Sequence, residues 1–411
     1  RHQGAPGRRR RVSAGPRQPL ALPDFPWDSL AAAAERARSH PDGLIDLSVG
    51  SPVDPTQSVA SAALAAAADA HAYPVTSGSA ALREAIVAWF ERRRGVVGLT
   101  AANVIPTVGS KEAIGLLPLI LGLGPGDIVV HPETAYPTYA VGAVAVGATP
   151  MALDDPASWP EATKLVWLNS PGNPDGRVLS IEQLRLAVAR AREIGAVIVS
   201  DECYAELNWA GEQPTPSILD PAVIGDSRAN VLAIYSLSKQ SNLAGYRAGI
   251  VAGCSRLVAE ILGVRKHLGL MVPAPIQAAM TAVLADDEHV AQQRERYRAR
   301  REQLSAALVA AGYRIDHSEA GLYLWATKGD DAWTRVDELA GLGILVAPGS
   351  LYGTAGTQHV FTLGDDRTGS LLDRAAHCSD THASVPMQAD DLAAILYTSG
   401  TTGKPKAALV S

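Results

Sequence analysis

The stretch YSLSKQSNLAGYRAGIVAG, residues 235–253, decides how the rest of the chain is interpreted. It places Lys239 among serines and Arg247 a few residues further on. The flanking runs VLAIY and AGIVAG are apolar throughout, which is typical of strands buried on both faces of a sheet. A lysine and an arginine therefore occupy a loop between two core strands. Taken alone, this loop fits either an ordinary solvated turn or a reactive amine beside an anion-binding site.

The composition is that of an ordinary globular protein. Of the 411 residues, 47% are hydrophobic and 19% are charged, and the formal net charge is −6. The negative balance argues against a nucleic-acid partner, and no apolar run reaches the roughly 18 residues of a membrane span. The widely spaced Cys203, Cys254 and Cys378 predict neither a disulfide framework nor a metal site, and they favour a cytoplasmic location.

The first twenty residues contain six arginines and no acidic residue. Such a segment is compatible with a transit peptide or a nucleic-acid-binding arm. We expect instead a disordered basic extension over residues 1–21, or read-through of upstream sequence. This segment is excluded from the predicted fold.

Strand-like and helical patterns alternate along most of the chain. Amphipathic runs separate the apolar segments, which predicts an α/β fold with a mostly parallel sheet flanked by helices. The apolar segments are 103–110, 127–131, 164–168 and 196–200, and the main helical runs are 79–95, 111–124 and 180–194. We expect an arm over 22–50, a large domain over 51–285 and a smaller α+β domain over 286–376, atypical after 360.

Short polar clusters follow four of the predicted strands. They are GSK at 109–111, NSPGNPDG at 169–176, DECY at 201–204 and SLSK at 236–239. In an open α/β sheet, ligands bind at the carboxyl ends of the strands, and a helix start favours a phosphate. Each cluster alone fits a helix cap or a polar turn, but four at one sheet edge predict a binding site.

These clusters resemble the class I/II aminotransferase family of pyridoxal-phosphate (PLP) enzymes. The segments SLSK and GYRAG are similar to the family signature S-x-S-K followed by G-x-R-x-G, and the resemblance spans about residues 24–360. It implies the PLP-dependent transferase fold type I, in which a large domain carries a smaller α+β domain. It also implies PLP as cofactor, no metal, and amino-acid and 2-oxo-acid substrates.

The resemblance assigns roles around the cofactor ring. Lys239 would form the Schiff base with the aldehyde and move the proton during catalysis. Asp201 would pair with the pyridinium nitrogen, which makes the ring an electron sink. Tyr204 and Asn173 would hydrogen-bond the phenolic oxygen, and Tyr136 would stack on the ring.

The phosphate of the cofactor would lie between the strand ends and a helix start. Ser110, Ser236 and Arg247 resemble the phosphate-binding residues, and an arginine can hold two phosphate oxygens at once. The backbone of Gly109 and Lys111 would add to this site. For Lys111, a solvated lysine at a helix start is the alternative.

Two further residues extend the expected site. Tyr73, in YPVTSGSAALREAI, resembles the tyrosine that reaches the phosphate of the neighbouring subunit, so we expect a homodimer; a surface tyrosine is the alternative. Gly50, in LSVGSP, resembles the glycine that lies along the substrate carboxylate, as Asn173 also would; a plain turn glycine is the alternative. Cys203 is expected to be a buried bystander.

Within the family, the chain looks most like the N-succinyldiaminopimelate aminotransferases. The stretches behind this are LPDFPWDSL, DLSVGSPVDP, SDECYAEL, RKHLGLMVPAPIQAAM and AGLYLWAT. The resemblance implies glutamate as donor and N-succinyl-2-amino-6-oxopimelate as acceptor. Aspartate, alanine and LL-diaminopimelate aminotransferases share the cofactor residues, which do not separate the substrates.

The sequence departs from the family pattern at two positions. Asp175 replaces the threonine of the usual N-P-T-G turn, a change that we expect to be tolerated. Phe361 stands where the family has the arginine that binds the substrate α-carboxylate, and Arg367 is the next arginine. This change predicts retained PLP binding with weakened turnover, and it leaves a catalytically impaired homologue as the alternative function.

The final segment has a different character. Residues 389–411, ADDLAAILYTSGTTGKPKAALVS, resemble the phosphate-binding loop of AMP-forming acyl-CoA synthetases, with Lys404 or Lys406 supplying charge. The remainder of an adenylating domain does not follow it in the sequence given. We therefore expect a foreign-looking tail over 377–411, produced by a gene fusion, a frameshift or an assembly error, without adenylating activity.

Overall fold

The computed structural model describes residues 20–363, 396–398 and 406–408. Most of the predicted extension at 1–21 and of the tail at 377–411 lies outside these residues, as does Arg367. Within the tail, two short strands, β14 (Leu396–Thr398) and β15 (Lys406–Ala408), pair with each other in antiparallel fashion.

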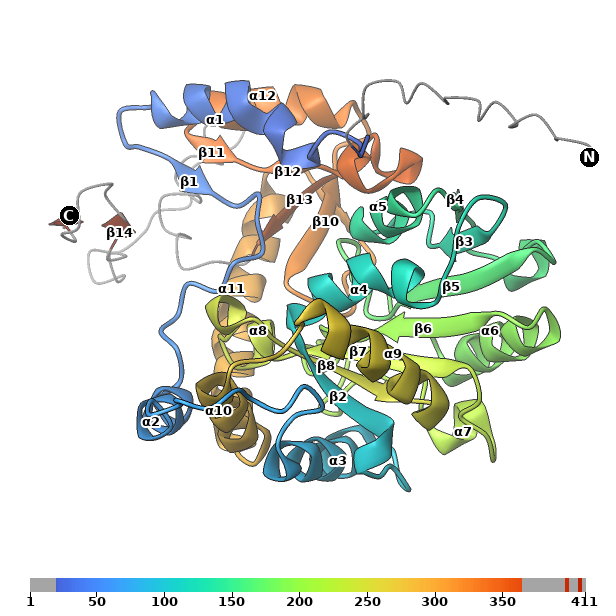
Figure 1. The fold of residues 1–411 in the computed structure, drawn as a ribbon. Coiled ribbons are helices and arrows are strands. Elements are labelled where there is room, and N and C mark those ends of the chain that lie inside the picture. The colour runs from blue at the N-terminus through green and yellow to red at the C-terminus, as the bar shows by residue number, and fades with distance from the viewer. Residues whose placement is uncertain (1–19, 364–395, 399–405, 409–411) are drawn as a thin grey trace, which may run out of the picture.

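A seven-stranded sheet forms the centre of the larger unit (Figure 1). Its spatial order is β2-β8-β7-β6-β5-β3-β4. The strands are β2 (Val104–Val108), β3 (Ile128–His131), β4 (Thr149–Ala152), β5 (Thr163–Asn169), β6 (Val197–Asp201), β7 (Val231–Ser236) and β8 (Ala248–Gly253). The four strands β3 to β6 are parallel to one another and to β7, which confirms the predicted mostly parallel sheet.

Strand β8 is the exception to this direction. It lies between β2 and β7 and runs antiparallel to both. The start of β8 therefore lies at the same edge of the sheet as the ends of β6 and β7.

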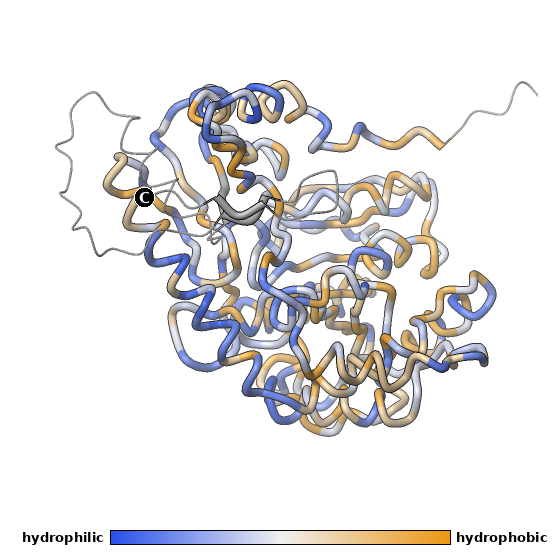
Figure 2. Tube along the Cα trace, turned by 90° about the vertical axis from the view of Figure 1, so that its left-hand side faces the viewer, coloured by the Kyte–Doolittle hydropathy of each residue, from blue (hydrophilic) through white to orange (hydrophobic). Residues whose placement is uncertain are grey.

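Helices cover both faces of the sheet, because the strands are apolar on both faces. One face packs against α2 (Ser58–Ala66), α3 (Ala80–Arg94), α6 (Ile181–Glu193), α7 (Pro221–Ile224) and α10 (Ala274–Leu284). The other packs against α4 (Gly109–Ile120), α5 (Thr138–Ala145) and α9 (Ser255–Leu268). In Figure 2 the centre of this unit is mainly hydrophobic.

Local signals explain where these helices begin and end. Ser79 accepts a hydrogen bond from the backbone of Leu82 at the start of α3, and Gly95 ends the helix with φ 65°. Ser180 and Gln183 form a reciprocal capping box at the start of α6. The bounds of α3 and the start of α6 agree with the helices predicted at 79–95 and 180–194.

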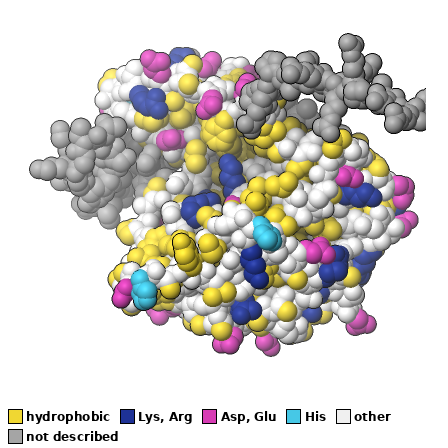
Figure 3. Space-filling model, viewed as in Figure 1, with side chains coloured by type: hydrophobic (Ala, Val, Ile, Leu, Met, Phe, Trp, Pro, Cys, Tyr) yellow, Lys and Arg dark blue, Asp and Glu magenta, His cyan; other side chains and the backbone are white. Residues whose placement is uncertain are grey.

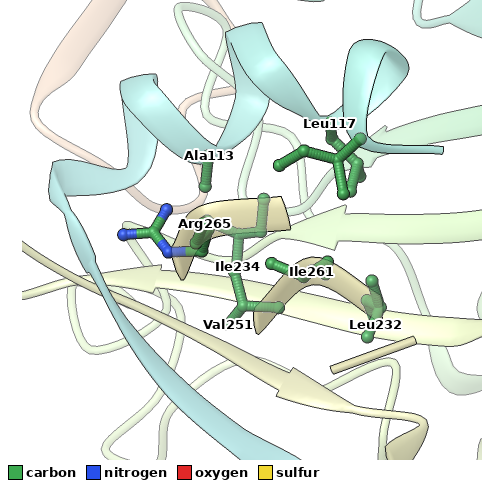
Figure 4. A pocket seen from close by; sticks show the side chains of 8 residues that line it. Ala113, Leu117, Leu232, Ile234, Val251, Ile261 and Arg265 are labelled. Carbon is green, nitrogen blue, oxygen red and sulfur yellow. The ribbon is translucent and has the colours of Figure 1, made fainter. Parts of the chain in front are cut away.

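One charged pair is buried between α4, α9 and the sheet. Apolar side chains of β7 and β8 line a small cavity there (Figure 4), and the fully buried Arg265 lies at its side. Arg265 donates to Glu112 Oε1 at 2.5 Å, while Glu112 Oε2 accepts from the backbone of Val108 at 3.0 Å. The pair thus fixes the start of α4, which forms part of the site described below.

The smaller unit is built on a four-stranded sheet of order β12-β13-β10-β9. Its strands are β9 (Arg314–Asp316), β10 (Tyr323–Thr327), β12 (Ala347–Pro348) and β13 (Val360–Leu363). The N-terminal segment joins this unit, because β1 (Ile45–Asp46) pairs with β11 (Ile344–Leu345) and α1 (Ala31–Arg38) packs on α12 (Ala332–Gly341). The predicted domain boundaries at 50/51 and 285/286 stay predictions.

A long helix, α11 (Glu288–Ala310), runs beside both units (Figure 1). It contacts β9 and β10 of the smaller unit and the short helix α8 (Leu237–Gln240) of the larger one. Figure 2 shows that α11 is hydrophilic along much of its length. The short 3₁₀ helices are Pro26–Leu30, Ala101–Asn103, Pro156–Ser158, Ala244–Tyr246, Gly349–Tyr352 and Thr354–Gly356.

Across residues 20–363 and the two short strands beyond them, no helix combines the length and the apolar character needed to cross a membrane. In the same part of the chain, no three His, Cys, Asp or Glu side chains are grouped to hold a metal ion. The predicted cytoplasmic location stays a prediction.

Candidate active site

A pocket of about 490 Å³ lies where the two units meet, at the carboxyl edge of the large sheet. Figure 3 shows basic and apolar side chains side by side at this junction. The pocket wall brings together most of the residues singled out in the sequence: Gly50, Ser110, Lys111, Tyr136, Asn173, Asp201, Tyr204, Ser236, Lys239 and Arg247.

The sheet topology explains why these residues meet. Asp201 ends β6 and Ser236 ends β7, two neighbouring parallel strands. Arg247 directly precedes β8, whose antiparallel direction brings its start to the same edge. The segment between β7 and β8 therefore places both Lys239 and Arg247 at this edge of the sheet.

Lys239 lies on the single turn of α8 and points across the pocket. Ser236 caps this turn, because its hydroxyl oxygen accepts from the backbone N–H of Ser238 at 3.1 Å. The Lys239 ammonium donates to the carbonyl oxygen of Gly50. Burial lowers the pKa of Lys239 to about 8, and the positive charge of Arg247 adds to this effect. The neutral amine, which can accept a proton, is therefore more populated near neutral pH than that of an ordinary lysine, although the ammonium form still predominates there.

Asp201 is a buried carboxylate with defined partners. Its Oδ2 accepts from the Tyr139 hydroxyl at 2.9 Å, and its Oδ1 accepts from the backbone N–H of Cys203 at 3.1 Å. Burial raises the pKa of Asp201, although the bonds from Cys203 and Tyr139 oppose this rise. A protonated ring nitrogen is the type of partner that favours the charged carboxylate here.

Tyr139 was not among the predicted site residues. Its ring is fully buried and stacks on Trp167, with centroids 5.1 Å apart and an interplanar angle of 21°. Tyr139 stands three residues after Tyr136 in the segment AYPTYA, close to the start of α5. This spacing was the only sequence signal that could have indicated it.

Asn173 and Tyr204 supply neutral polar groups to the pocket. The side-chain oxygen of Asn173 is buried and has no hydrogen-bond partner among the described residues. Asn169 holds this loop, because its Oδ1 accepts from the backbone N–H of Asn173 at 2.8 Å and its amide donates to the Asp201 carbonyl at 3.0 Å. Burial raises the pKa of Tyr204 well above its ordinary value, so its hydroxyl stays a donor.

Two glycines make room for an anion-binding cradle at the start of α4. A Cβ on Gly249 would lie 2.7 Å from the backbone nitrogen of Ser110, and one on Gly109 would lie 2.3 Å from Arg247 Nη2. Gly109 also has φ +75°, which favours glycine. Helix start, guanidinium and the hydroxyls of Ser110 and Ser236 thus converge on one region.

Some predicted residues are placed differently. Gly109 is not part of the pocket wall and instead lies under the Arg247 guanidinium. Tyr73 is 93% exposed in this single chain and does not line the pocket. Phe361 lies on β13, with its backbone opposite Trp325 and Ala347. The residues of the wall that sequence reasoning did not select include Phe25, Trp27, Asn169, Ser238, Tyr323 and Tyr352.

The sheet order and this pocket define a pyridoxal-phosphate enzyme of fold type I. Residues 42–360 match the model of the family described as aminotransferase class I and II. The chain therefore belongs to this family, and it is a PLP-dependent aminotransferase. The fold class and the type of enzyme expected from the sequence are confirmed.

Curated relatives agree with this assignment. A 4-dedimethylamino-4-oxo-anhydrotetracycline transaminase of Streptomyces rimosus is 53% identical over 86% of this chain and 99% of its own length. A protein named probable aminotransferase from Mycobacterium tuberculosis is 51% identical over 90% of this chain and 89% of its own length. An LL-diaminopimelate aminotransferase of Gloeobacter violaceus is 32% identical, covering 86% of this chain and 95% of the relative.

Solved structures show the same architecture. An aminotransferase from Neisseria meningitidis has a TM-score of 0.78 at 28% identity, covering 87% of this chain and 97% of the other. A probable N-succinyldiaminopimelate aminotransferase from Thermus thermophilus has a TM-score of 0.77 at 28% identity, covering 86% and 99%.

The pocket fits the cofactor that members of this family use, pyridoxal 5′-phosphate. An amine of lowered pKa, a buried carboxylate, an unpartnered buried amide oxygen and an anion cradle all face one space. When bound, this group supplies an electron sink for negative charge that develops at the substrate Cα. The remaining chemistry falls to the side chains of the chain itself.

Proposed function

We propose that the protein transfers the amino group of glutamate to N-succinyl-2-amino-6-oxopimelate, forming 2-oxoglutarate and N-succinyl-LL-2,6-diaminopimelate. Such a reaction belongs to lysine and diaminopimelate biosynthesis. Support comes from the diaminopimelate aminotransferases among the relatives and the succinyldiaminopimelate aminotransferase among the solved structures. The observation that carries the proposal is a third basic side chain, Lys111, in the wall of the pocket.

In this proposal Lys239 is the catalytic residue. Its Nζ removes the proton from Cα of the amino donor and, in the second half of the reaction, returns one to Cα of the acceptor. Asp201 would hold the ring nitrogen of the cofactor, Tyr204 and Asn173 would hold its phenolic oxygen, and Tyr136 would lie against the ring.

The phosphate of the cofactor would occupy the cradle at the start of α4. Ser110, Ser236 and Arg247 bind it in this proposal, because they converge where the helix start presents free N–H groups. Gly109 shapes the cradle rather than lining it.

Lys111 has a different environment from the cradle residues. Its Nζ lies 5.4 Å from the ring centroid of Phe25 and 5.8 Å from that of Tyr136. Rings at this distance favour a cation through their negative faces. We assign Lys111 to the carboxylates of the acidic substrates rather than to the phosphate, which revises the role expected from the resemblance.

A second acceptor class has a specific observation in its favour. Aromatic side chains contribute much of the pocket wall: Phe25, Trp27, Tyr136, Tyr204, Tyr323 and Tyr352. The S. rimosus relative, at 53% identity, is named for an oxo-anhydrotetracycline substrate. An acceptor with a planar ring system and an oxo group is therefore the alternative to the succinylated oxo acid.

The replacement at residue 361 supports a third possibility for turnover. Besides Lys239 and Arg247, Lys111 is the basic side chain in the wall formed by the described residues. A substrate carboxylate that lacks the expected arginine loses on the order of 2–5 kcal/mol of binding energy. The alternative function is accordingly a PLP-binding homologue with impaired turnover.

We further propose a homodimer in which Tyr73 reaches the partner's site. Tyr73 and Val75 are 93% and 61% exposed, and the carbonyl of Val75 accepts from Gln277, which lines the groove between α3 and α10. Figure 3 shows apolar side chains gathered on the lower left of the molecule, where α2 and α10 lie in Figure 1. Sedimentation of the purified protein tests this assembly, and a Tyr73→Phe variant tests its contribution to PLP affinity.

The first experiment is a half-reaction with glutamate. The protein is loaded with PLP, its visible absorbance is recorded, and excess glutamate is added. Conversion of the cofactor to its amine form supports transamination and leads to a comparison of the succinylated oxo acid with a planar polycyclic ketone. A cofactor absorbance that does not respond to glutamate, alanine or aspartate supports the impaired homologue instead.

A further inference from the structure

The main chain of Lys239 is held by a tyrosine from the long helix α11. The hydroxyl of Tyr297 lies 3.3 Å from the carbonyl oxygen of Lys239 and 3.1 Å from Oδ1 of Asn242. Tyr297 and Asn242 are 5% and 6% exposed. A hydroxyl with one proton can share it between two such acceptors. Tyr297 therefore contacts the chain both within the turn that carries Lys239 and just after it.

Asn242 continues this connection into a buried polar network. Its amide donates to Gln293 Oε1 at 2.9 Å, and Gln293 Nε2 donates to Asp54 Oδ2 at 2.6 Å. Asn242 has φ 54°, a backbone conformation that asparagine adopts more readily than most residues. Both the side-chain hydrogen bonds and the backbone conformation of Asn242 therefore contribute to this network.

The network ends at a buried ion pair. Asp54 accepts from both terminal nitrogens of Arg300, at 2.7 and 2.6 Å. Burial raises the pKa of Asp54, but the bonds from Arg300 and Gln293 outweigh this and hold the pKa below its ordinary value. The carboxylate is therefore charged at neutral pH and fixes the position of Gln293.

The residues of α11 that form the network share one face of the helix. Gln293, Tyr297 and Arg300 follow each other at intervals of four and three residues, so they are stacked along the helix. All three are buried, with Gln293 0% and Arg300 9% exposed. Apolar side chains at such positions commonly stabilise a fold as well or better, so a polar face of this kind indicates a requirement for defined geometry.

The amine of Lys239 is also connected to the smaller unit and to the chain segment that contains Asp54. Its Nζ donates to the carbonyl of Gly50, whose own N–H donates to the Tyr323 hydroxyl of β10 at 3.0 Å. Asp54 follows Gly50 by four residues. The position of the smaller unit, through α11 and β10, thus bears on both the main chain and the amine of Lys239.

We propose that Tyr297 and Asn242 are positioning residues for Lys239, held in place by the ion pair between Asp54 and Arg300. Through them the orientation of α11 sets the path of the Lys239 turn. The inference rests on the proposed catalytic role of Lys239 and is independent of which acceptor the enzyme uses.

The test compares Tyr297→Phe with Arg298→Ala in the PLP-loaded protein. Tyr297→Phe removes only the hydroxyl, and we expect about a tenfold fall in kcat with little change in KM. We also expect the pH midpoint of the cofactor's visible absorbance to shift by at least half a unit. Arg298, on the same helix, pairs with Glu295 at 3.1 Å and with Glu212 at 3.5 Å, and its variant should match the wild type.

A second variant keeps the proposal testable if Tyr297→Phe folds poorly. Asn242→Gly removes both the acceptor for Tyr297 and the donor to Gln293, adds no charge and tolerates the positive φ at this position, so it should produce the same absorbance shift. The double variant should lose less than the product of the two single effects, because both act on one turn. An unchanged absorbance midpoint in both single variants overturns the proposal. If the wild type does not respond to amino donors but the variants still show the shifted midpoint, only the proposed function is overturned.

Discussion

The hydroxyl of Tyr139 donates to Oδ2 of Asp201 at 2.9 Å, although 62 residues separate the two in the sequence. Asp201 lines the pocket, whereas Tyr139 is fully buried and stacks on Trp167. Asp201 therefore reaches the pocket already oriented. Tyr139 donates to Oδ2 and the backbone N–H of Cys203 donates to Oδ1, so the directions from which a ring nitrogen could approach this carboxylate are restricted.

Replacing this tyrosine should weaken cofactor binding. Tyr139→Phe removes one hydrogen bond to a carboxylate, worth about 1–2 kcal/mol, so we expect PLP affinity to fall about tenfold. Loss of this bond also raises the pKa of Asp201 further, so the deficit should grow as the pH is lowered. Titration of the cofactor-free protein with PLP at several pH values measures both effects. An affinity equal to wild type at every pH contradicts the assigned role.

A variant of Lys111 distinguishes the proposed substrate-binding role from the phosphate-binding role that the resemblance implied. If Lys111 binds substrate carboxylates, Lys111→Met should raise KM for the acidic acceptor about tenfold, the loss of roughly one charged hydrogen bond, and change PLP affinity less than twofold. Ser110→Ala is the matched variant, because it should lower PLP affinity instead. Steady-state kinetics and PLP titration of both proteins give the answer. A lysine variant that loses PLP as the serine variant does would return Lys111 to the phosphate site.

An arginine at residue 361 should restore a lost interaction. Phe361→Arg places the family's carboxylate-binding residue on β13, and recovery of about 2 kcal/mol corresponds to a gain of about 30-fold in kcat/KM for glutamate. Thr362→Arg adds the same charge one residue further along the strand and serves as control. Equal gains in both variants would indicate a general electrostatic effect, and no gain would show that another group already holds the carboxylate.

The lowered pKa of Lys239 predicts how stability depends on pH. The ordinary pKa is 10.5 and the folded value is about 8, so the unfolded chain binds more protons between these values. Stability of the cofactor-free protein should therefore rise with pH across this window. Lys239→Met lacks this dependence, and its advantage over wild type, largest below pH 8, should shrink by up to about 3 kcal/mol towards pH 10.5.

Urea unfolding of the cofactor-free proteins at intervals from pH 7 to 10.5 measures this difference. Lys164→Met, which replaces an exposed lysine on β5, is the control and should follow the wild type. A constant difference between Lys239→Met and wild type across the window would show that the amine is not desolvated in the folded protein.

Much of the site could be predicted because its residues stand at the ends of apolar strands. Asp201 is the last residue of β6, and Lys239 lies on α8, which directly follows β7; the chemistry of each residue type is evident from the sequence alone. Strand β4 was missed, because TPMA is a partly exposed edge strand that contains a proline. The antiparallel direction of β8 could not be predicted, since an apolar run has the same pattern in either direction.

Sequence patterns could not identify the residues that hold the site in place. Tyr139 and Tyr297 act through partners 62 and 55 to 58 residues away. Such contacts depend on how helices dock on the sheet, which no local periodicity specifies. The aromatic residues of the N-terminal segment were quoted for family resemblance, but their place in the pocket wall was not predicted.

The position of Phe25 and Trp27 has a practical consequence for work with this enzyme. Both line the pocket, and the Trp27 indole donates to the Ser48 carbonyl at 3.3 Å. Shortening the chain to residue 31 to improve expression or crystallisation would open one side of the active site. The same two positions offer a starting point for libraries that alter the acceptor range, because substitutions there leave the cofactor-binding loops untouched.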